Sequence, residues 1–139
     1  MANRLTKGRG LLGAIRTSGV VAANTATKKA TVTTLTDAAE VLTAAMVVTN
    51  GGLLKGTPTA TRAKTVPTGA LTCAALNGYA VGDTFEVNFI NLTAATHALT
   101  VTAATGATIV GSATVAAATS ATYRVLVSAT DTVIWHRVA

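Results

Sequence analysis

Apolar and polar residues alternate with a period of two along much of the chain after residue 30. Such alternation is typical of strands that turn one face toward a core. The clearest case covers residues 84–92, where Phe85, Val87 and Phe89 share one face. Residues 97–103, 122–127 and 132–138 alternate in the same way, and weaker strand candidates occupy 30–35, 44–49, 59–66 and 107–110. The pattern therefore predicts about eight short strands.

The alternation also predicts which side chains form the core. The window 122–127 places Tyr123, Val125 and Val127 on one face, and the window 132–138 places Trp135 on the same side as Val133. Large apolar side chains on one face of a strand are stabilised when they pack together in a core. We expect Tyr123, Val125 and Val127 to pack against the face that carries Phe85.

Helical signals are few and short. Pro67 and Thr68 precede the apolar segment 70–76, where Thr68 can cap the first turn and Gly78 can end the last one. A second helical turn is predicted at 37–42. Many short strands with one or two short helices predict an all-β fold, either an antiparallel β-sandwich or a jelly roll.

Composition predicts a thin core. The chain has 139 residues, which suits a single domain, and it contains 29 Ala and 28 Thr but only five aromatic residues. Ordering costs about 1.5 kcal/mol per residue, and burial returns about 25 cal/mol per Å² of apolar surface. Because small side chains bury little area, we expect a homo-oligomer whose copies pack through flat Ala/Thr-rich surfaces.

Charge divides the chain into two parts. The whole net charge of +6 falls in residues 1–29, which contain no acid, and its carriers are Arg4, Lys7, Arg9, Arg16, Lys28 and Lys29. Residues 30–139 hold five basic and five acidic side chains. We predict an extended basic arm, residues 1–29, followed by a β-sandwich body, residues 30–139, and assign partner binding to the six cations of the arm.

A basic arm suits an acidic partner, which could be a nucleic acid, an anionic membrane or a protein surface; a solvated tail is the plainer alternative. The arm has no aromatic residue to stack on single-stranded nucleic acid. Its apolar run, residues 11–15, is too short for a secretion signal, and no stretch of the chain is long enough to span a membrane. We therefore expect a protein partner, with neither a nucleic acid nor a membrane.

The motifs that could carry chemistry lack their usual context. Residues 8–13 fit G-x-G-x-x-G, but no strand precedes them, so a dinucleotide site is not expected. The N-glycosylation sequon at residues 91–93 lies at the end of a strongly predicted strand, so we do not interpret it as a glycosylation site. His97 and His136 do not have a metal-ligand spacing, and Cys73 reads as a small buried side chain.

The acidic side chains of the body also favour structural roles. Asp83 follows Gly82 at a turn, and Asp131 lies in a predicted hairpin turn at 129–132, so a catalytic cluster with Glu86 would require a coincidence of folding. We therefore expect no enzyme activity, no catalytic residues, no metal site and no cofactor.

A resemblance to a known group of proteins lies in residues 57–138. It is carried by the segments Thr57-Pro58-Thr59-Ala60, 66–70, 75–86 and 109–125, among them Val81-Gly82-Asp83-Thr84-Phe85-Glu86. In these segments the chain resembles small structural proteins of tailed bacteriophages, of the capsid decoration or cement type.

The resemblance implies a non-enzymatic virion protein on the capsid surface. Such a protein would bind the major capsid protein at junctions between capsomers and stabilise the shell, and a homotrimer is favoured. The alternative is a tail, connector or fibre component, for which host recognition is one conceivable role. A basic module that binds nucleic acid comes third, and would show a steep salt dependence of DNA binding.

Overall fold

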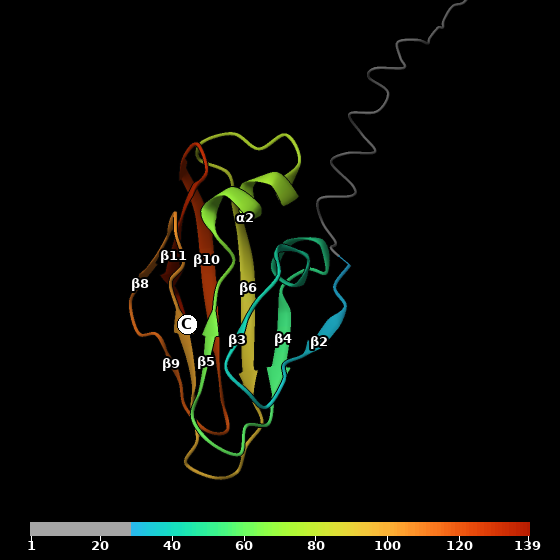
Figure 1. The fold of residues 1–139 in the computed structure, drawn as a ribbon, viewed down its shortest axis with the longest axis vertical. Coiled ribbons are helices and arrows are strands. Elements are labelled where there is room, and N and C mark those ends of the chain that lie inside the picture. The colour runs from blue at the N-terminus through green and yellow to red at the C-terminus, as the bar shows by residue number, and fades with distance from the viewer. Residues whose placement is uncertain (1–28) are drawn as a thin grey trace, which may run out of the picture.

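Residues 29–139 are described by a computed structural model, in which they form ten strands and two helices (Figure 1). In chain order the elements are β2 (Val32–Thr34), β3 (Glu40–Val41), η1 (Ala45–Thr49), β4 (Leu53–Gly56), β5 (Arg62–Thr65), α2 (Gly69–Leu76), β6 (Thr84–Asn91), β7 (Leu99–Thr102), β8 (Ala107–Val110), β9 (Thr114–Val115), β10 (Thr119–Ala129) and β11 (Thr132–Arg137). The predicted mainly-β fold is therefore confirmed. Of the predicted arm, only Lys29 lies within the described residues.

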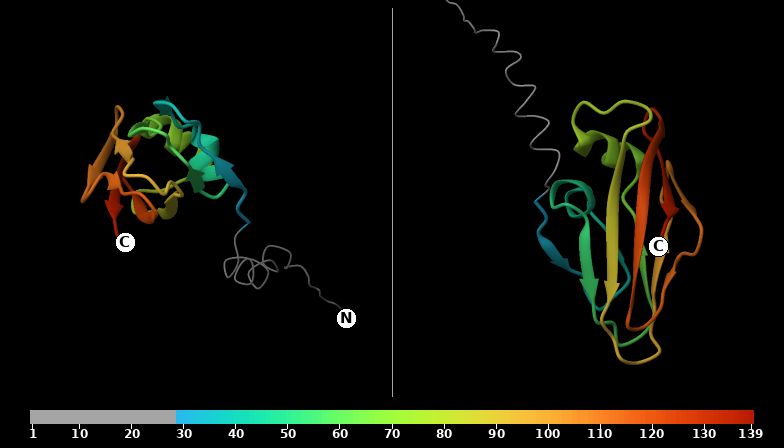
Figure 2. Two further views of the ribbon diagram at one scale, coloured as in Figure 1. Left: turned by 90° about the horizontal axis from the view of Figure 1, so that it is seen from below. Right: turned by 180° about the vertical axis from the view of Figure 1, so that it is seen from behind.

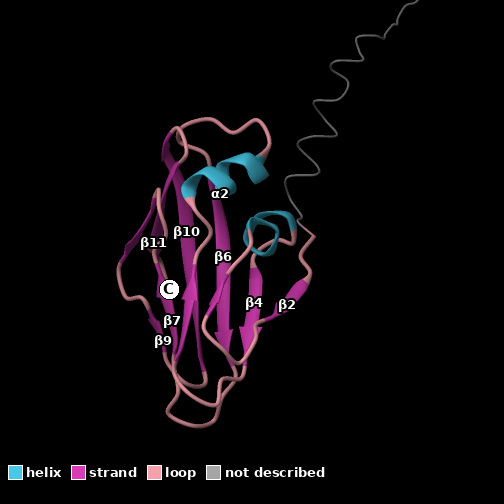
Figure 3. Ribbon diagram, viewed as in Figure 1, coloured by secondary structure: helices cyan, strands magenta, loops and turns pink. Residues whose placement is uncertain are grey.

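The strands form two sheets whose pairings are mixed (Figure 3). The six-stranded sheet has the order β2-β4-β6-β10-β11-β8, and the four-stranded sheet has the order β3-β5-β7-β9. Five of the eight pairings are parallel. The prediction of antiparallel sheets is therefore wrong.

The path of the chain explains the parallel pairs. From β2 to β7, successive strands belong alternately to the six-stranded and the four-stranded sheet. Parallel neighbours need a crossover between them, and here a strand of the opposite sheet supplies it. A period of two in the sequence is the same for parallel and antiparallel strands, so it could not distinguish them.

The long strand β10 runs between β6 and β11 and is antiparallel to both. Its register places Val125 opposite Phe85 on one side and opposite Trp135 on the other. Tyr123, Val125 and Val127 are all buried, as the alternation predicted.

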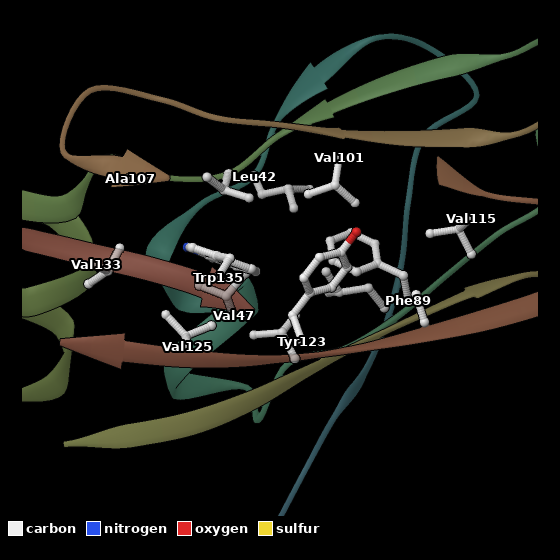
Figure 4. Close-up of a cluster of buried hydrophobic side chains, with 14 of the residues drawn as sticks. Leu42, Val47, Phe89, Val101, Ala107, Val115, Tyr123, Val125, Val133 and Trp135 are labelled. Atoms are coloured by element: carbon white, nitrogen blue, oxygen red, sulfur yellow. The ribbon is translucent and has the colours of Figure 1, made fainter. Parts of the chain in front are cut away.

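Buried side chains from both sheets form one cluster, and the view from below shows the two sheets around this common interior (Figures 2 and 4). Phe89, Tyr123 and Trp135 lie at its centre. The rings of Phe89 and Tyr123 meet edge to face at 5.9 Å, and those of Tyr123 and Trp135 at 6.2 Å. The predicted core residues on β6, β10 and β11 are thus confirmed, although Phe85 is only partly buried.

Helix α2 begins and ends close to the predicted points. The Thr68 side chain accepts a hydrogen bond from the Leu71 N–H at 3.2 Å, as an N-cap does. At the other end Asn77 takes the left-handed conformation with φ 55°, and Gly78 follows with φ 86°. Asn77 therefore supplies the left-handed cap, one residue before the glycine expected to end the helix.

Two short elements differ from their predictions. Residues 45–49 form the π-helical turn η1 rather than a strand, closed by the Asn50 N–H on the Ala45 carbonyl. Residues 40–41 form strand β3 rather than a helical turn, because the side chain of Glu40 bonds across to β5. Strand β4 carries no clear alternation with polar residues and was not predicted.

Candidate interaction surface

The residues predicted to bind a partner lie almost entirely outside the described part of the chain. Arg4, Lys7, Arg9, Arg16 and Lys28 belong to residues 1–28, whereas Lys29 is described and exposed. The described residues therefore show only the point at which the predicted arm would meet the body.

The junction is held by close backbone packing. The Thr31 N–H donates to the Asn50 carbonyl at 2.8 Å, just before β2 begins. Gly51 follows with φ 85°, and a Cβ atom there would lie 2.8 Å from the Cβ of Ala30 and 2.9 Å from the Lys29 carbonyl oxygen. Only glycine allows this approach at that backbone angle without strain. The turn after η1 thus fixes the direction in which residue 29 leaves the body.

Strand β2 is an edge of the six-stranded sheet. It pairs with β4 on one side, and no strand of residues 29–139 pairs with its other side. Val32 is 49% exposed at this edge. An open edge offers backbone donors and acceptors to another chain. Residue 29, at the boundary of the predicted arm, therefore lies just before an edge strand that can accept a further strand.

The charges of the body are largely neutralised by pairing. Residues 29–139 contain three ion pairs: Arg62 with Asp37, Lys64 with Glu40, and Arg124 with Glu86. The pair between Arg124 and Glu86 is 2.9 Å long and joins β10 to β6 on the exposed outer face of the six-stranded sheet. Exposed pairs of this kind contribute little to stability, and this pair adds no net charge to the face.

Lys64 is the one fully buried cation among these residues. Its Nζ donates to the Thr36 carbonyl at 2.7 Å, the Ala38 carbonyl at 2.8 Å and Glu40 Oε1 at 2.7 Å. All three ammonium protons thus have acceptors, as a buried charge requires. Lys64 holds the loop between β2 and β3 against β5, which is a structural role.

The carboxyl group of Glu40 accepts from Thr36 as well as from Lys64. The Thr36 N–H lies 2.8 Å from Oε1, and the Thr36 hydroxyl donates to the same oxygen. Burial raises the pKa of Glu40, but the hydrogen bonds from Lys64 and Thr36 outweigh it and lower the pKa below its usual value. Glu40 therefore remains ionised at neutral pH.

Asp37 anchors the same loop from the solvent side. Its carboxylate accepts from Arg62 Nε at 2.8 Å and from the hydroxyl of Thr59 at 2.6 Å. These hydrogen bonds hold the pKa of Asp37 well below its usual range. With the Lys64 cluster, this network ties the loop between β2 and β3 to β5.

All five aromatic side chains of the protein lie within the described residues, and all contribute to the interior. Phe89, Tyr123 and Trp135 are fully buried, while Phe85 and Tyr79 pack against the core cluster. Burial raises the pKa of Tyr123, although nearby Arg137 acts in the opposite direction. Sugar-binding surfaces commonly stack sugars on exposed aromatic rings, and these rings are already in use for packing.

The remaining candidates for chemistry are dispersed. Cys73 is buried as predicted. His97, in the loop between β6 and β7, and His136, on β11, are both half-buried. No group of three His, Cys, Asp or Glu side chains that could hold a metal occurs in residues 29–139. Among the same residues, no helix has the length and apolar character to span a membrane.

Asn91 of the sequon is buried at the end of β6. Its side-chain amide donates to the His97 carbonyl at 2.9 Å and the Val115 carbonyl at 3.0 Å. A glycan on this nitrogen would replace one of its two hydrogens, so both bonds could not form together, and the Asn91 amide has a structural role in the fold. Beside it, an open pocket of about 420 Å³ is lined by Ile90, Asn91, Leu92, Ala118, Thr119 and Ser120, none of which can titrate.

Comparisons of the chain with protein-family models, with curated proteins and with solved structures gave no match. The features on which a function can be argued are the uneven charge along the sequence and the glycine-dependent turn at Gly51.

Two features of the structure were missed in the sequence. Lys64 is a charged residue at a buried position of β5. Its burial is explained by the hydrogen bonds that it donates to the loop 36–40, which the sequence does not show. Helix α2 was recognised, but its exposed Leu71 was not. The absence of any charged residue in 69–76 was the available signal.

Proposed function

We propose that the protein is a non-enzymatic structural protein of a tailed-phage virion, most specifically a capsid decoration or cement protein. It binds the outside of the capsid at junctions between capsomers, with the major capsid protein as its partner, and it stabilises the shell. We interpret its body as a β-sandwich and its working form as a homo-oligomer, with a trimer favoured by the resemblance of residues 57–138 to phage structural proteins.

The observation that carries the proposal is the division of charge. Residues 1–29 have a charge of +6, whereas the described body has its acids and bases balanced and mostly paired. A neutral body contributes little long-range attraction, so the arm directs the protein to an acidic surface. In an oligomer several arms bind together, and linked weak contacts give an avidity far above that of one arm.

The first experiment is cryo-electron microscopy of phage particles that carry the protein. We expect density on the capsid exterior at capsomer junctions, with the arm following the shell. Density only at the tail or portal would replace the decoration function with that of a tail, connector or fibre component. The buried positions of Trp135 and Tyr123 argue against a fibre tip that binds sugars through aromatic stacking.

A binding assay tests the role of the arm directly. Particles lacking the protein are mixed with the full chain or with a variant that lacks residues 1–29, and bound protein is measured after sedimentation. The variant should keep the circular dichroism of a folded β-protein but lose binding. Full binding by the truncated protein would show that the body, not the arm, recognises the capsid.

A further inference from the structure

Helix α2 leaves apolar side chains in solvent. Its sequence, GALTCAAL, contains no charged residue. The helix buries Gly69, Thr72 and Cys73 against the body, yet Ala70 and Ala74 are exposed and Leu71 is 58% exposed. A helix that is apolar on every side is ordinarily covered on every side. The outer side of α2 is therefore a surface without its cover.

Further apolar and acidic groups lie at the same end of the molecule. Val81, in the loop that follows α2, is 64% exposed. That loop reaches the β10–β11 turn, because the Asp131 N–H donates to the Tyr79 hydroxyl at 3.4 Å. Asp83 and Asp131 are both exposed, and neither forms an ion pair within residues 29–139. We call this surface the α2 end and define it by Ala70, Leu71, Ala74, Val81, Asp83 and Asp131.

The arm joins the body close to the α2 end. Residues 29–30 pack on Gly51, directly after η1, and η1 packs against α2 (Figure 1). The preceding arm contains one apolar run, Leu11-Leu12-Gly13-Ala14-Ile15, with Arg9 and Arg16 on either side. An apolar run between two cations complements an apolar surface that carries two acids. The occupant with the right chemistry is thus tethered beside the surface.

We propose that residues 11–15 bind the α2 end of their own chain, with Leu11, Leu12 and Ile15 covering the exposed apolar side chains and the two arginines facing the two aspartates. The 13 residues between this run and Lys29 span up to about 45 Å when extended, which lets the run reach past η1 to its neighbour α2. Tethering keeps the effective concentration of the run near the millimolar range, so a modest affinity suffices.

This inference rests on the arm of the proposed function and divides it into two parts. Residues 11–16 act as a clip that fixes the arm to the body, and Arg4 and Lys7 form the part that remains available to the capsid. The test below uses isolated protein without phage particles, so its failure is distinct from a failure of capsid binding.

Disulfide trapping in the full chain tests the clip. In a Cys73→Ala background, Leu12→Cys is combined with Leu71→Cys, and the protein is oxidised mildly at low concentration. Leu12→Cys combined with Leu92→Cys is the matched control, because Leu92 is 53% exposed but lies at the end of β6, away from α2. Non-reducing electrophoresis and peptide mass spectrometry then identify the linked residues.

We expect an intramolecular disulfide in the first variant at a yield at least fivefold above that of the control. Disulfide-linked dimers as the main product would overturn the proposal in favour of arm exchange between copies. Equal yields in the two variants, or no disulfide in either, would also overturn it, because the run would then have no preference for α2.

Proteolysis gives a second measurement without new cysteines. If the clip forms, Leu71→Ser and Val81→Ser should each speed trypsin cleavage after Arg16 by about fivefold, and Leu92→Ser should not. Both side chains are already exposed, so the body should remain folded, as the fluorescence of buried Trp135 would report. Unchanged cleavage in both variants would contradict the proposal.

Discussion

Lys64 shows at the scale of one residue how a charge is accommodated in a thin core. Its methylene groups occupy a core position on β5, and its ammonium group bonds to two carbonyl oxygens and to Glu40. Removing either partner of such a pair leaves the other charge poorly solvated. The cluster therefore couples the loop between β2 and β3 to the four-stranded sheet.

The same cluster makes stability depend on pH. The pKa of Glu40 is lower in the folded chain than its ordinary value of 4.5, so on acidification the unfolded chain binds the proton first. The free energy of unfolding should therefore fall as the pH drops from about 4.5 through the folded-state pKa. In Glu40→Gln this fall should be shallower in urea titrations between pH 5 and pH 3.

Glu86→Gln is the matched control for that titration. Glu86 also pairs with a cation, but its side chain is 45% exposed. Because an exposed pair contributes little, this variant should keep the wild-type slope. A Glu40→Gln protein with the wild-type slope as well would mean that the buried pair does not contribute to acid sensitivity.

Gly69 sets a second constraint at residue scale. A Cβ atom at this position would lie 2.2 Å from the Asp131 carbonyl oxygen and 2.3 Å from that of Gly106. Both neighbours are backbone atoms and cannot simply turn away. Gly69→Ala should therefore lower the free energy of unfolding by about 1–3 kcal/mol through overpacking. Urea denaturation measures the change.

Gly78→Ala separates crowding from backbone strain. Nothing lies within 4 Å of a Cβ atom at Gly78, although its φ of 86° disfavours alanine. Strain alone should cost about 1 kcal/mol. A larger loss at Gly78 than at Gly69 would contradict the close contact of α2 with the β10–β11 turn.

At the scale of elements, the sequence predicted the strands with large side chains best. The alternation in β6, β10 and β11 identified both the strands and their buried faces. Aromatic and β-branched side chains on one face of each strand all pack into the same core. The segment 44–49 has similar residues, yet it forms η1. Its Asn50-Gly51-Gly52 sequence closes a helical turn as readily as it closes a hairpin.

Strand β6 carries two phenylalanines that differ in burial, so the cost of removing each should differ as well. Phe89 is fully buried against Tyr123, whereas Phe85 on the same face is only partly buried near the start of the strand. Phe89→Ala should cost about 3–5 kcal/mol of unfolding free energy. Phe85→Ala should cost clearly less, because less of its surface leaves water. Thermal and urea unfolding of the two variants should show this order, and the reverse order would contradict the observed burial.

At the scale of the whole molecule, the hydrophobic alternation along a strand does not determine which other strands it pairs with. The period of two fixed which face of a strand is buried, but the alternate use of two sheets from β2 to β7 depends on contacts between distant segments. The candidate arm could be predicted from the sequence because the charge of a segment follows from its residues alone. The exposed side of α2 could not be, because exposure depends on what the rest of the chain covers.

The division of charge leads to a prediction for binding in solution. If the arm directs the protein to an acidic capsid surface, replacing Arg4 or Lys7 with Gln should slow association with particles, and the effect should shrink as salt is added. Lys55→Gln removes one positive charge from the body instead, on the outer face of β4. It is the matched control and should change the association rate little.

Stopped-flow light scattering at several salt concentrations measures these rates. Each arm variant should bind severalfold more slowly at low salt and approach the wild-type rate near 0.5 M salt, where the screening length is only about 4 Å. An equal effect of Lys55→Gln would mean that total charge, not its position in the arm, governs association. The neutral, internally paired body would then have no separate role from the arm, and the division of the chain at residue 29 would lose its functional meaning.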